Sequence, residues 1–395
     1  MRDREDRAGS GDFSLVLGGP LYQLFLRTRL ARPPLDLLRR RVAAITLFAW
    51  LPLLVLSALE GRAFGGVAIP FLHDLDAQVR LLVALPVLLL AEKVVHDRLR
   101  PAVARFVDDG LVRPPDRARF DGFVSSTLRW RNSAVVEILL LVFTFTLGHT
   151  LWVEKLAVQG ATWFAKPAEA GAGLSGAGLW YAWVSLPIFQ FLVLRWWYRL
   201  ALWARLMWLT SRLDLDLTPS HPDLAGGLGF LGPATAAFAP IFAAQSALVS
   251  ALAAGRILQQ GAQLQSFKVE LGGMLALALL QALGPLLVFG PALAAAKRRG
   301  LGEFGALGSR YVREFNRKWM HGGAAPDEAL VGTSDIQSLA DLSGSFDVVR
   351  KMRLFPFGKE TVMALVVTTA LPVLPLLLTV MPLEELVKTL AKAIL

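Results

Sequence analysis

Long apolar runs separated by short polar connections dominate the chain. Stretches of about 18 to 25 residues with few charges are long enough to cross a hydrocarbon core of about 30 Å. Seven such stretches lie at roughly residues 42–59, 79–95, 134–153, 179–200, 230–254, 271–296 and 361–381. The pattern predicts an all-α fold: a polytopic transmembrane helix bundle of about seven spans, with short cytoplasmic amphipathic helices.

The second and fourth stretches are less regular than the others. The clean apolar run of the second covers only residues 81–91 and ends at Glu92 and Lys93, so this helix either crosses at a tilt or dips into the membrane. The fourth continues past Arg195 and Arg199, and we expect its helix to leave the membrane. Prolines recur inside the stretches at positions 52, 86, 187, 240, 285, 291, 372 and 375. Because proline bends helices, this modestly favours a transport protein.

Basic residues are distributed unevenly between the connections. The charged residues near span ends, Arg80, Lys93, Arg195 and Arg199, are counted with the adjoining connections. From the N-terminus, the connections then hold 9, 2, 9, 2, 4, 2, 11 and 2 Lys+Arg. High and low counts alternate without exception, and cytoplasmic connections carry the excess in membrane proteins. The sequence therefore predicts a cytoplasmic N-terminus and an external C-terminus.

Composition agrees with a membrane protein and excludes several other classes. Of 395 residues, 54% are hydrophobic and 18% charged, with a mean hydropathy of +0.50. The net charge of +10 follows from the cytoplasmic connections, so we expect no nucleic-acid partner. The absence of cysteine excludes a disulfide scaffold, a thiolate zinc site and a cysteine nucleophile. No cleavable signal peptide is expected, because about 40 residues precede the first span.

The chain divides into four regions. Residues 1–41 form a cytoplasmic segment that is partly disordered, with an interfacial helix expected between residues 13 and 30. Residues 42–296 form the membrane domain with about six spans, and residues 297–359 form a cytoplasmic amphipathic helical hairpin. Residues 360–395 hold the final span and a short external tail.

The hairpin carries a basic face. Phe304, Leu307, Tyr311, Phe315 and Trp319 recur at helical spacing and share one apolar face. The remainder is basic, with Arg310, Arg313, Arg317 and Lys318. Such a face is typical of a helix that binds anionic lipid headgroups or packs on its own protein, and a separate partner is the alternative. Ser334 is the expected N-cap of the second helix.

A glycine-rich turn, HPDLAGGLGF at residues 221–230, precedes the fifth span. Free backbone N–H groups near the start of a helix suit an anion or a phosphate. His221, Asp223, Gly226 and Gly227 are therefore candidates for binding an ion or ligand. The alternative is that the glycines permit close helix packing while His221 and Asp223 cap the turn.

Ionisable residues at membrane depth are functional candidates, because each must be paired or face water. The residues that fall at the cytoplasmic level, where they are expected to form one polar layer, are Glu92, Lys93, Glu137, Arg195, His221 and Asp223. This layer is either a set of ion pairs that holds helices together or an ion pathway with Glu137 in a water-filled cavity.

Enzyme signatures are weak. Five histidines are scattered along the chain, and no spacing matches a zinc site or a nucleophile elbow. We therefore predict no metal, no cofactor and no catalytic residue.

Three segments resemble those of a group of bacterial multi-span membrane proteins. They are HPDLAGGLGF at 221–230, SDIQSLAD at 334–341 and VRKMR at 349–353. The resemblance extends over most of the chain and implies a bacterial inner-membrane location. It implies no activity and carries over no functional residue.

Three functions stay open at this point. A channel or transporter for an ion or small solute comes first, because of the bent spans and the polar layer. A membrane scaffold or sensor that binds a cytoplasmic partner through the hairpin comes second, and a membrane enzyme acting on a lipid phosphate third. A homo-oligomer in the lipid bilayer is compatible with each.

Overall fold

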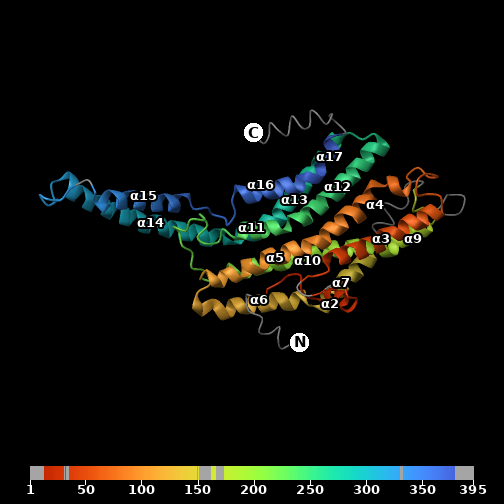
Figure 1. Cartoon of the computed structure of the whole chain (residues 1–395), viewed down its shortest axis with the longest axis horizontal. Coiled ribbons are helices and arrows are strands. Elements are labelled where there is room, and N and C mark those ends of the chain that lie inside the picture. Colours follow the sequence, from red (N-terminus) through yellow and green to blue (C-terminus); the bar gives the residue numbers. More distant parts are fainter. Residues whose placement is uncertain are drawn as a thin grey trace.

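Every regular element is a helix among the residues that the structure describes. The computed structural model describes residues 13–30, 32, 35–148, 150, 162–165, 173–329 and 332–378. In chain order the α-helices are α2 (Pro20–Arg27), α3 (Leu38–Leu59), α4 (Leu75–Gln78), α5 (Leu85–Asp108), α6 (Arg117–Arg131), α7 (Ala134–Phe143), α9 (Gly176–Trp180), α10 (Leu186–Thr210), α11 (Leu231–Thr235), α12 (Ala239–Gln260), α13 (Lys268–Leu283), α14 (Gly290–Phe315), α15 (Ser334–Lys351), α16 (Lys359–Ala370) and α17 (Leu374–Leu377) (Figure 1). The prediction of an all-α fold is confirmed.

Five helical stretches are long and apolar enough to cross a membrane, as expected of an integral membrane protein. They are Leu38–Leu59, Gly176–Thr210, Leu231–Gln260, Leu264–Met320 and Lys359–Leu377. The second predicted span lies in a helical stretch that also carries Asp76, Arg80, Glu92 and Lys93, and the third begins with a shorter apolar helix, Ala134–Thr146. Residues 151–161, the end of the third prediction and beyond, lie outside the described residues. The number of seven spans therefore stays a prediction.

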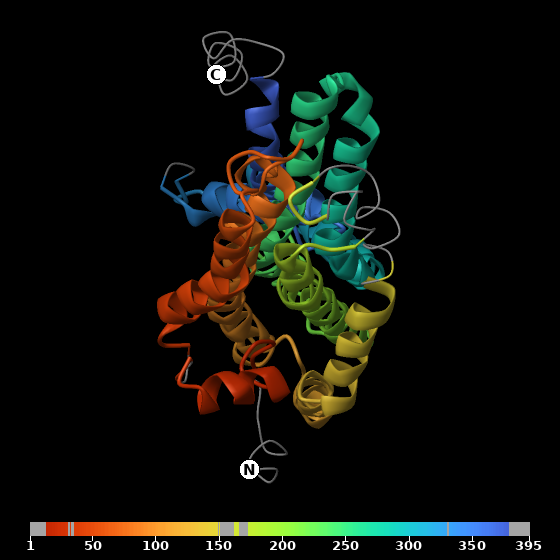
Figure 2. The same ribbon diagram turned by 90° about the vertical axis from the view of Figure 1, so that its right-hand side faces the viewer.

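The burial of these stretches separates central from peripheral helices. The apolar windows of the stretches containing α12 and α10 are 67% and 56% buried, whereas that of α3 is 17% buried. The windows of the last two stretches are each 22% buried. The view down the long axis shows the other helices arranged around α5 and α10 (Figure 2). The exposed apolar faces of α3, α13 and α16 are those expected to contact lipid.

Connections predicted on one side of the membrane contact one another. Those predicted inside meet through Val112 with Leu215, Arg113 with Asp214, and Arg353 with Leu224. Those predicted outside meet through Ile69 with Thr162, Asp74 with Trp163, and Glu60 with Gly176. Connections that the basic residues predict on the same side of the membrane therefore lie close together in the fold.

Prolines interrupt the α-helices in a regular manner. A π-helical turn precedes Pro86 and another precedes Pro187, and a short 3-10 segment precedes Pro240 and Pro291. Because proline lacks an N–H group, the α-helical hydrogen bond to the preceding turn is lost, and that turn changes its geometry. The helices therefore bend at these points and continue.

The helical hairpin predicted for residues 297–359 projects from one end of the molecule (Figure 1). Residues Leu264–Met320 form one helical run of 57 residues, so α14 continues from α13. α15 packs back along α14, and its N-cap is Thr333, not the expected Ser334. The structure thus shows a hairpin of two packed helices in this region, as the sequence predicts.

Candidate functional site

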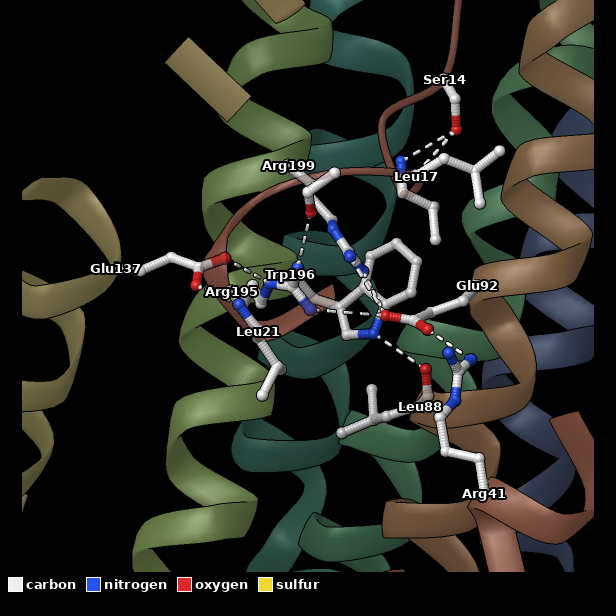
Figure 3. A network of polar contacts seen from close by, with 12 residues as sticks. Ser14, Leu17, Leu21, Arg41, Leu88, Glu92, Glu137, Arg195, Trp196 and Arg199 are labelled. Carbon is white, nitrogen blue, oxygen red and sulfur yellow. Dashed lines mark hydrogen bonds and ion pairs between the residues drawn. The ribbon is translucent and has the colours of Figure 1, made fainter. Parts of the chain in front are cut away.

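A buried charge network joins four helices at the polar layer (Figure 3). At its centre lies Glu92 of α5. Its Oε2 accepts a hydrogen bond of 2.6 Å from Arg41 Nη2 of α3, and its Oε1 lies 3.0 Å from both Nη atoms of Arg199 of α10. One carboxylate therefore binds two guanidinium groups from different helices.

Arg195 extends this network to a fourth helix. Its Nη1 lies 3.6 Å from Glu92 Oε1, and its Nε lies 3.2 Å from Oε1 of Glu137 on α7. The five side chains are 1–6% exposed, so the ion pairs are shielded from water. Ion pairs at this burial interact strongly, and removal of one member leaves a costly unpaired charge.

The N-terminal segment closes the network on one side. Glu137 Oε2 accepts a hydrogen bond of 2.8 Å from the backbone N–H of Leu21, and Arg195 Nη2 donates to the carbonyl of Gly18 at 3.2 Å. Ser14 Oγ lies 2.9 Å from Nδ1 of His96, and the Ser14 carbonyl accepts from Arg131. Residues 13–16, which include Ser14, are each at most 3% exposed. The prediction that residues 13–30 lie along the membrane surface is therefore wrong for their first part, which is inserted into the protein.

Local sequence features place these side chains. Arg195 and Arg199 are four residues apart and therefore share one face of α10. Ser133 is the N-cap of α7 and accepts from Val136 N–H, which puts Glu137 in the first helical turn. Gly19 has φ +86°, and a Cβ atom there would lie 2.6 Å from Glu137 Oε1. Glycine is thus required where the N-terminal segment approaches the carboxylate.

The network has more positive than negative charge. Arg41, Arg195 and Arg199 face Glu92 and Glu137, which leaves one guanidinium charge uncompensated within it. Arg41 Nε–H and the Tyr22 hydroxyl are also buried, and neither has a hydrogen-bond partner among the described residues. A purely structural ion-pair cluster is expected to be balanced and fully hydrogen-bonded.

An apolar cavity of about 480 Å³ adjoins Glu137. Side chains of α2, α7 and α10 line it, among them Leu24, Ile138 and Phe191. Among the described residues, Glu137 is the one ionisable residue in this lining, so the network borders a space that is otherwise hydrophobic.

The glycine-rich turn at residues 221–230 has a different environment. The Asp223 carboxylate accepts hydrogen bonds from the backbone N–H groups of Ala225, Gly227 and Gly229 at 2.7–3.2 Å, and His221 Nδ1 lies 2.8 Å from Oδ1. The backbone N–H groups expected to bind an anion are therefore occupied by the protein's own carboxylate.

This turn is also bonded to the end of the helical hairpin. Arg353 donates to the carbonyl of Asp223 at 2.6 Å, and Gly226 has φ +64° with Met352 and Leu217 packed around it. Burial opposes ionisation of Asp223, but the three backbone hydrogen bonds outweigh it and hold the pKa of Asp223 below its ordinary value. The contacts favour the interpretation of His221, Asp223, Gly226 and Gly227 as packing and capping residues.

The basic residues of the hairpin differ in their exposure and in their ion-pair partners. Arg310, Arg313 and Arg317 lie on exposed positions, and Arg310 pairs with Glu314. Lys318 instead contacts Asp335 Oδ2 at 2.9 Å and Glu328 Oε1 at 2.5 Å. Hydrogen bonds to Glu328 and Asp335 raise the pKa of Lys318, and those from Lys318 and Trp319 lower the pKa of Asp335. Lys318 therefore joins the two helices near the hairpin tip.

Sequence reasoning found three of the five network residues. Glu92, Glu137 and Arg195 come together as the polar layer predicts, whereas Lys93 is exposed and pairs with Asp97. Arg41 and Arg199 were not among the candidates. The four-residue spacing from Arg195 could have indicated Arg199, but nothing distinguishes Arg41 from its basic neighbours Arg39 and Arg40.

Comparison of the chain with protein-family models, curated proteins and solved structures finds no match. The resemblance to bacterial multi-span proteins therefore stays a prediction, and the function rests on the geometry of the site.

Proposed function

We propose that the protein transports a small anionic solute across the bacterial inner membrane, with its N-terminus in the cytoplasm. The observation that carries this proposal is the uncompensated positive charge of the buried network. Charged side chains at membrane depth are costly and typically mark an ion or substrate pathway. A monovalent anion would balance three guanidinium groups and two carboxylates.

Unused hydrogen-bond donors support an anion over a cation. Arg41 Nε–H and the Tyr22 hydroxyl can donate to an incoming anion, and both lie on segments that surround Glu92. Both Glu92 oxygens and both Glu137 oxygens are already engaged by donors of the protein. A cation would have to displace an arginine from these carboxylates.

The N-terminal segment acts as a gate in this proposal. Its contacts with Glu137, Arg195 and His96 cover the network from one side, so a solute could reach the arginines only after residues 14–21 move away. Alternating closure of two ends is the general requirement for a transporter. The cavity beside Glu137 gives α2 an apolar space into which it can shift.

Uptake into liposomes that contain the purified protein tests this proposal. The probes are chloride, nitrate and inorganic phosphate, with rubidium as the cation. We expect uptake of at least one anion, no rubidium uptake, and a loss of about tenfold or more in Arg199→Gln, since one charge-assisted interaction is removed. Lys93→Gln, an exposed charge next to Glu92, is the matched control and should transport like the wild type.

Several outcomes would overturn the proposal. Absence of anion uptake by wild-type protein that is folded in the liposomes contradicts it, as does equal uptake of rubidium. Unchanged anion uptake in Glu137→Gln would remove Glu137 from the mechanism. Arg199→Lys keeps the positive charge. Its comparison with Arg199→Gln shows whether a loss of uptake follows from the lost charge or from a failure to fold.

A scaffold or sensor is the second candidate, because the hairpin bears exposed apolar side chains beyond the bundle. Leu307 is 51% exposed, Met320 67% and Ile336 49%. Apolar groups at this exposure are typical of protein-binding surfaces when they are clustered. Replacement of Met320 and Ile336 by Asp in the full chain should abolish the binding of any cytoplasmic partner and leave anion uptake unchanged.

A further inference from the structure

A second groove lies along α10, away from the charge network. It has a volume of about 660 Å³ and lies between residues 197–208 of α10 and residues 280–288 of the sixth span. Small residues at Ala201, Ala204 and Gly284 leave room between the two helices. Trp197 and Trp208 line it and are 46% and 47% exposed. Tryptophan is enriched where a membrane protein meets the headgroup region.

One basic side chain lines this groove and is incompletely bonded. Arg205 donates from Nη2 to Ser126 Oγ at 3.0 Å. Its Nη1 is shielded from water without a hydrogen-bond partner, and no carboxylate pairs with it among the described residues. A buried guanidinium N–H without an acceptor is unfavourable, so the site favours a ligand that supplies an oxygen anion.

The cavity beside Glu137 has the opposite chemistry. There the ionisable side chain is a carboxylate, and Arg195 and Leu21 N–H already occupy its oxygens. In the groove near Arg205, no described carboxylate compensates the positive charge, and Gln281 Oε1 has no hydrogen-bond partner among the described residues. The two apolar spaces on α10 therefore differ in what they can bind.

We propose that this groove binds an anionic phospholipid of the cytoplasmic leaflet. Its phosphate accepts from the Arg205 guanidinium, which lines the groove, and one acyl chain lies between α10 and residues 280–288. Charge complementarity selects this ligand over a neutral lipid, since no carboxylate pairs with Arg205 among the described residues. The site is independent of the charge network, so it stands whether or not the protein transports an anion.

Native mass spectrometry of the purified full-length protein tests this proposal. The probes are phosphatidylglycerol, phosphatidylcholine and diacylglycerol with identical acyl chains, together with inorganic phosphate. We expect phosphatidylglycerol to be retained best. Arg205→Gln should weaken its binding about tenfold or more, because a charge-assisted hydrogen bond is lost.

Matched variants separate the parts of the site. Arg212→Gln removes an exposed arginine at the same end of α10, stacked 5.2 Å from the Trp208 ring, and should leave retention unchanged. Ala204→Phe fills the groove and should abolish retention although Arg205 is intact. Arg205→Lys should restore part of the binding, and a thermal melt of each variant shows that it is folded.

Equal retention of the three lipids by the wild type would overturn the proposal. Equal losses in Arg205→Gln and Arg212→Gln would do the same, because surface charge alone would then explain binding. Full competition by inorganic phosphate would show that a free anion is the ligand. A wild-type dimer that retains no lipid and that Ala204→Phe dissociates would identify a second copy of the chain as the occupant.

Discussion

Arg199 directs both of its terminal guanidinium nitrogens at a single oxygen of Glu92, Oε1, with both distances 3.0 Å. The other oxygen of Glu92 is bound by Arg41 of α3, and Arg195 of α10 also lies within 3.6 Å of Oε1. Among the described residues, no other carboxylate pairs with three arginines. Glu92 is therefore the centre on which the stability of the network depends.

Replacement of Glu92 tests this dependence. In Glu92→Gln, Arg41 and Arg199 would remain buried without a carboxylate between them. We expect a loss of about 3–5 kcal/mol in unfolding free energy, as for other broken buried ion pairs. Denaturant unfolding in detergent measures it. Lys93→Gln removes the adjacent charge, which is 58% exposed, and should change stability by no more than about 0.5 kcal/mol. Equal effects of the two variants would contradict a central role of Glu92.

The N-terminal segment, residues 14–21, should be displaced by a single methyl group. Ala at position 19 would place Cβ 2.6 Å from Glu137 Oε1, so Gly19→Ala should displace the N-terminal segment. We expect trypsin to cleave after Arg27 or Arg29 about tenfold faster, equivalent to about 1.4 kcal/mol of local stability.

Gly61→Ala is the control for Gly19→Ala. Gly61 has a similar φ of +70°, but an added Cβ would meet nothing within 4 Å. Both substitutions carry the cost of a left-handed backbone, about 1–2 kcal/mol. Cleavage that is accelerated as much in Gly61→Ala would show that backbone strain, and not contact with Glu137, displaces the segment.

The lowered pKa of Asp223 predicts that the stability of the folded protein depends on pH. Its pKa is lowered in the folded protein, so its contribution is present above the ordinary carboxyl value of 3.8 and is lost as the pH falls through the folded pKa. Asp223→Asn should cost about 1–3 kcal/mol at pH 7 and nothing at strongly acidic pH. Thermal melts over this pH range measure the difference. Asp216→Asn, with a side chain that is 64% exposed, should show little effect at any pH.

The hairpin tip should respond to loss of one carboxylate. Asp335 Oδ2 binds both Lys318 and Trp319 at 2.9 Å, so Asp335→Asn weakens the contact between α14 and α15. The chain has no native cysteine. Spin labels on Met320→Cys and Ile336→Cys can therefore report the distance across the tip. We expect a broader distribution in Asp335→Asn, and no change in Asp341→Asn.

The wild-type tip should broaden in acid for the same reason. The pKa of Asp335 is lowered in the folded state, so its contact with Lys318 is present above the ordinary carboxyl value and is lost as the pH falls through the folded pKa. A label distribution that broadens equally in Asp335→Asn and in the wild type on acidification would exclude Asp335 as the responsible group.

The sequence predicted the helical class and the polar layer for physical reasons that can be named. A charge such as Glu92 or Glu137 is conspicuous in an apolar run, because it must find a partner there. Arg41 could not be identified, because an arginine before a span reads the same whether it faces headgroups or the protein interior. The insertion of residues 13–16 was missed for a similar reason, since membrane surface and protein core both select apolar side chains.

The uninterrupted helical run Leu264–Met320 connects the bilayer to the hairpin tip mechanically. The part from Gly290 to Met320 is about 45 Å long at 1.5 Å per residue. The 3-10 segment Gly284–Phe289 lies at its base and contacts α10, which bears Arg195 and Arg199. A rotation of about 10° at that joint would displace the tip by about 8 Å. A small rearrangement around the arginines would thus become a large movement of the hairpin tip, with the helix as a lever.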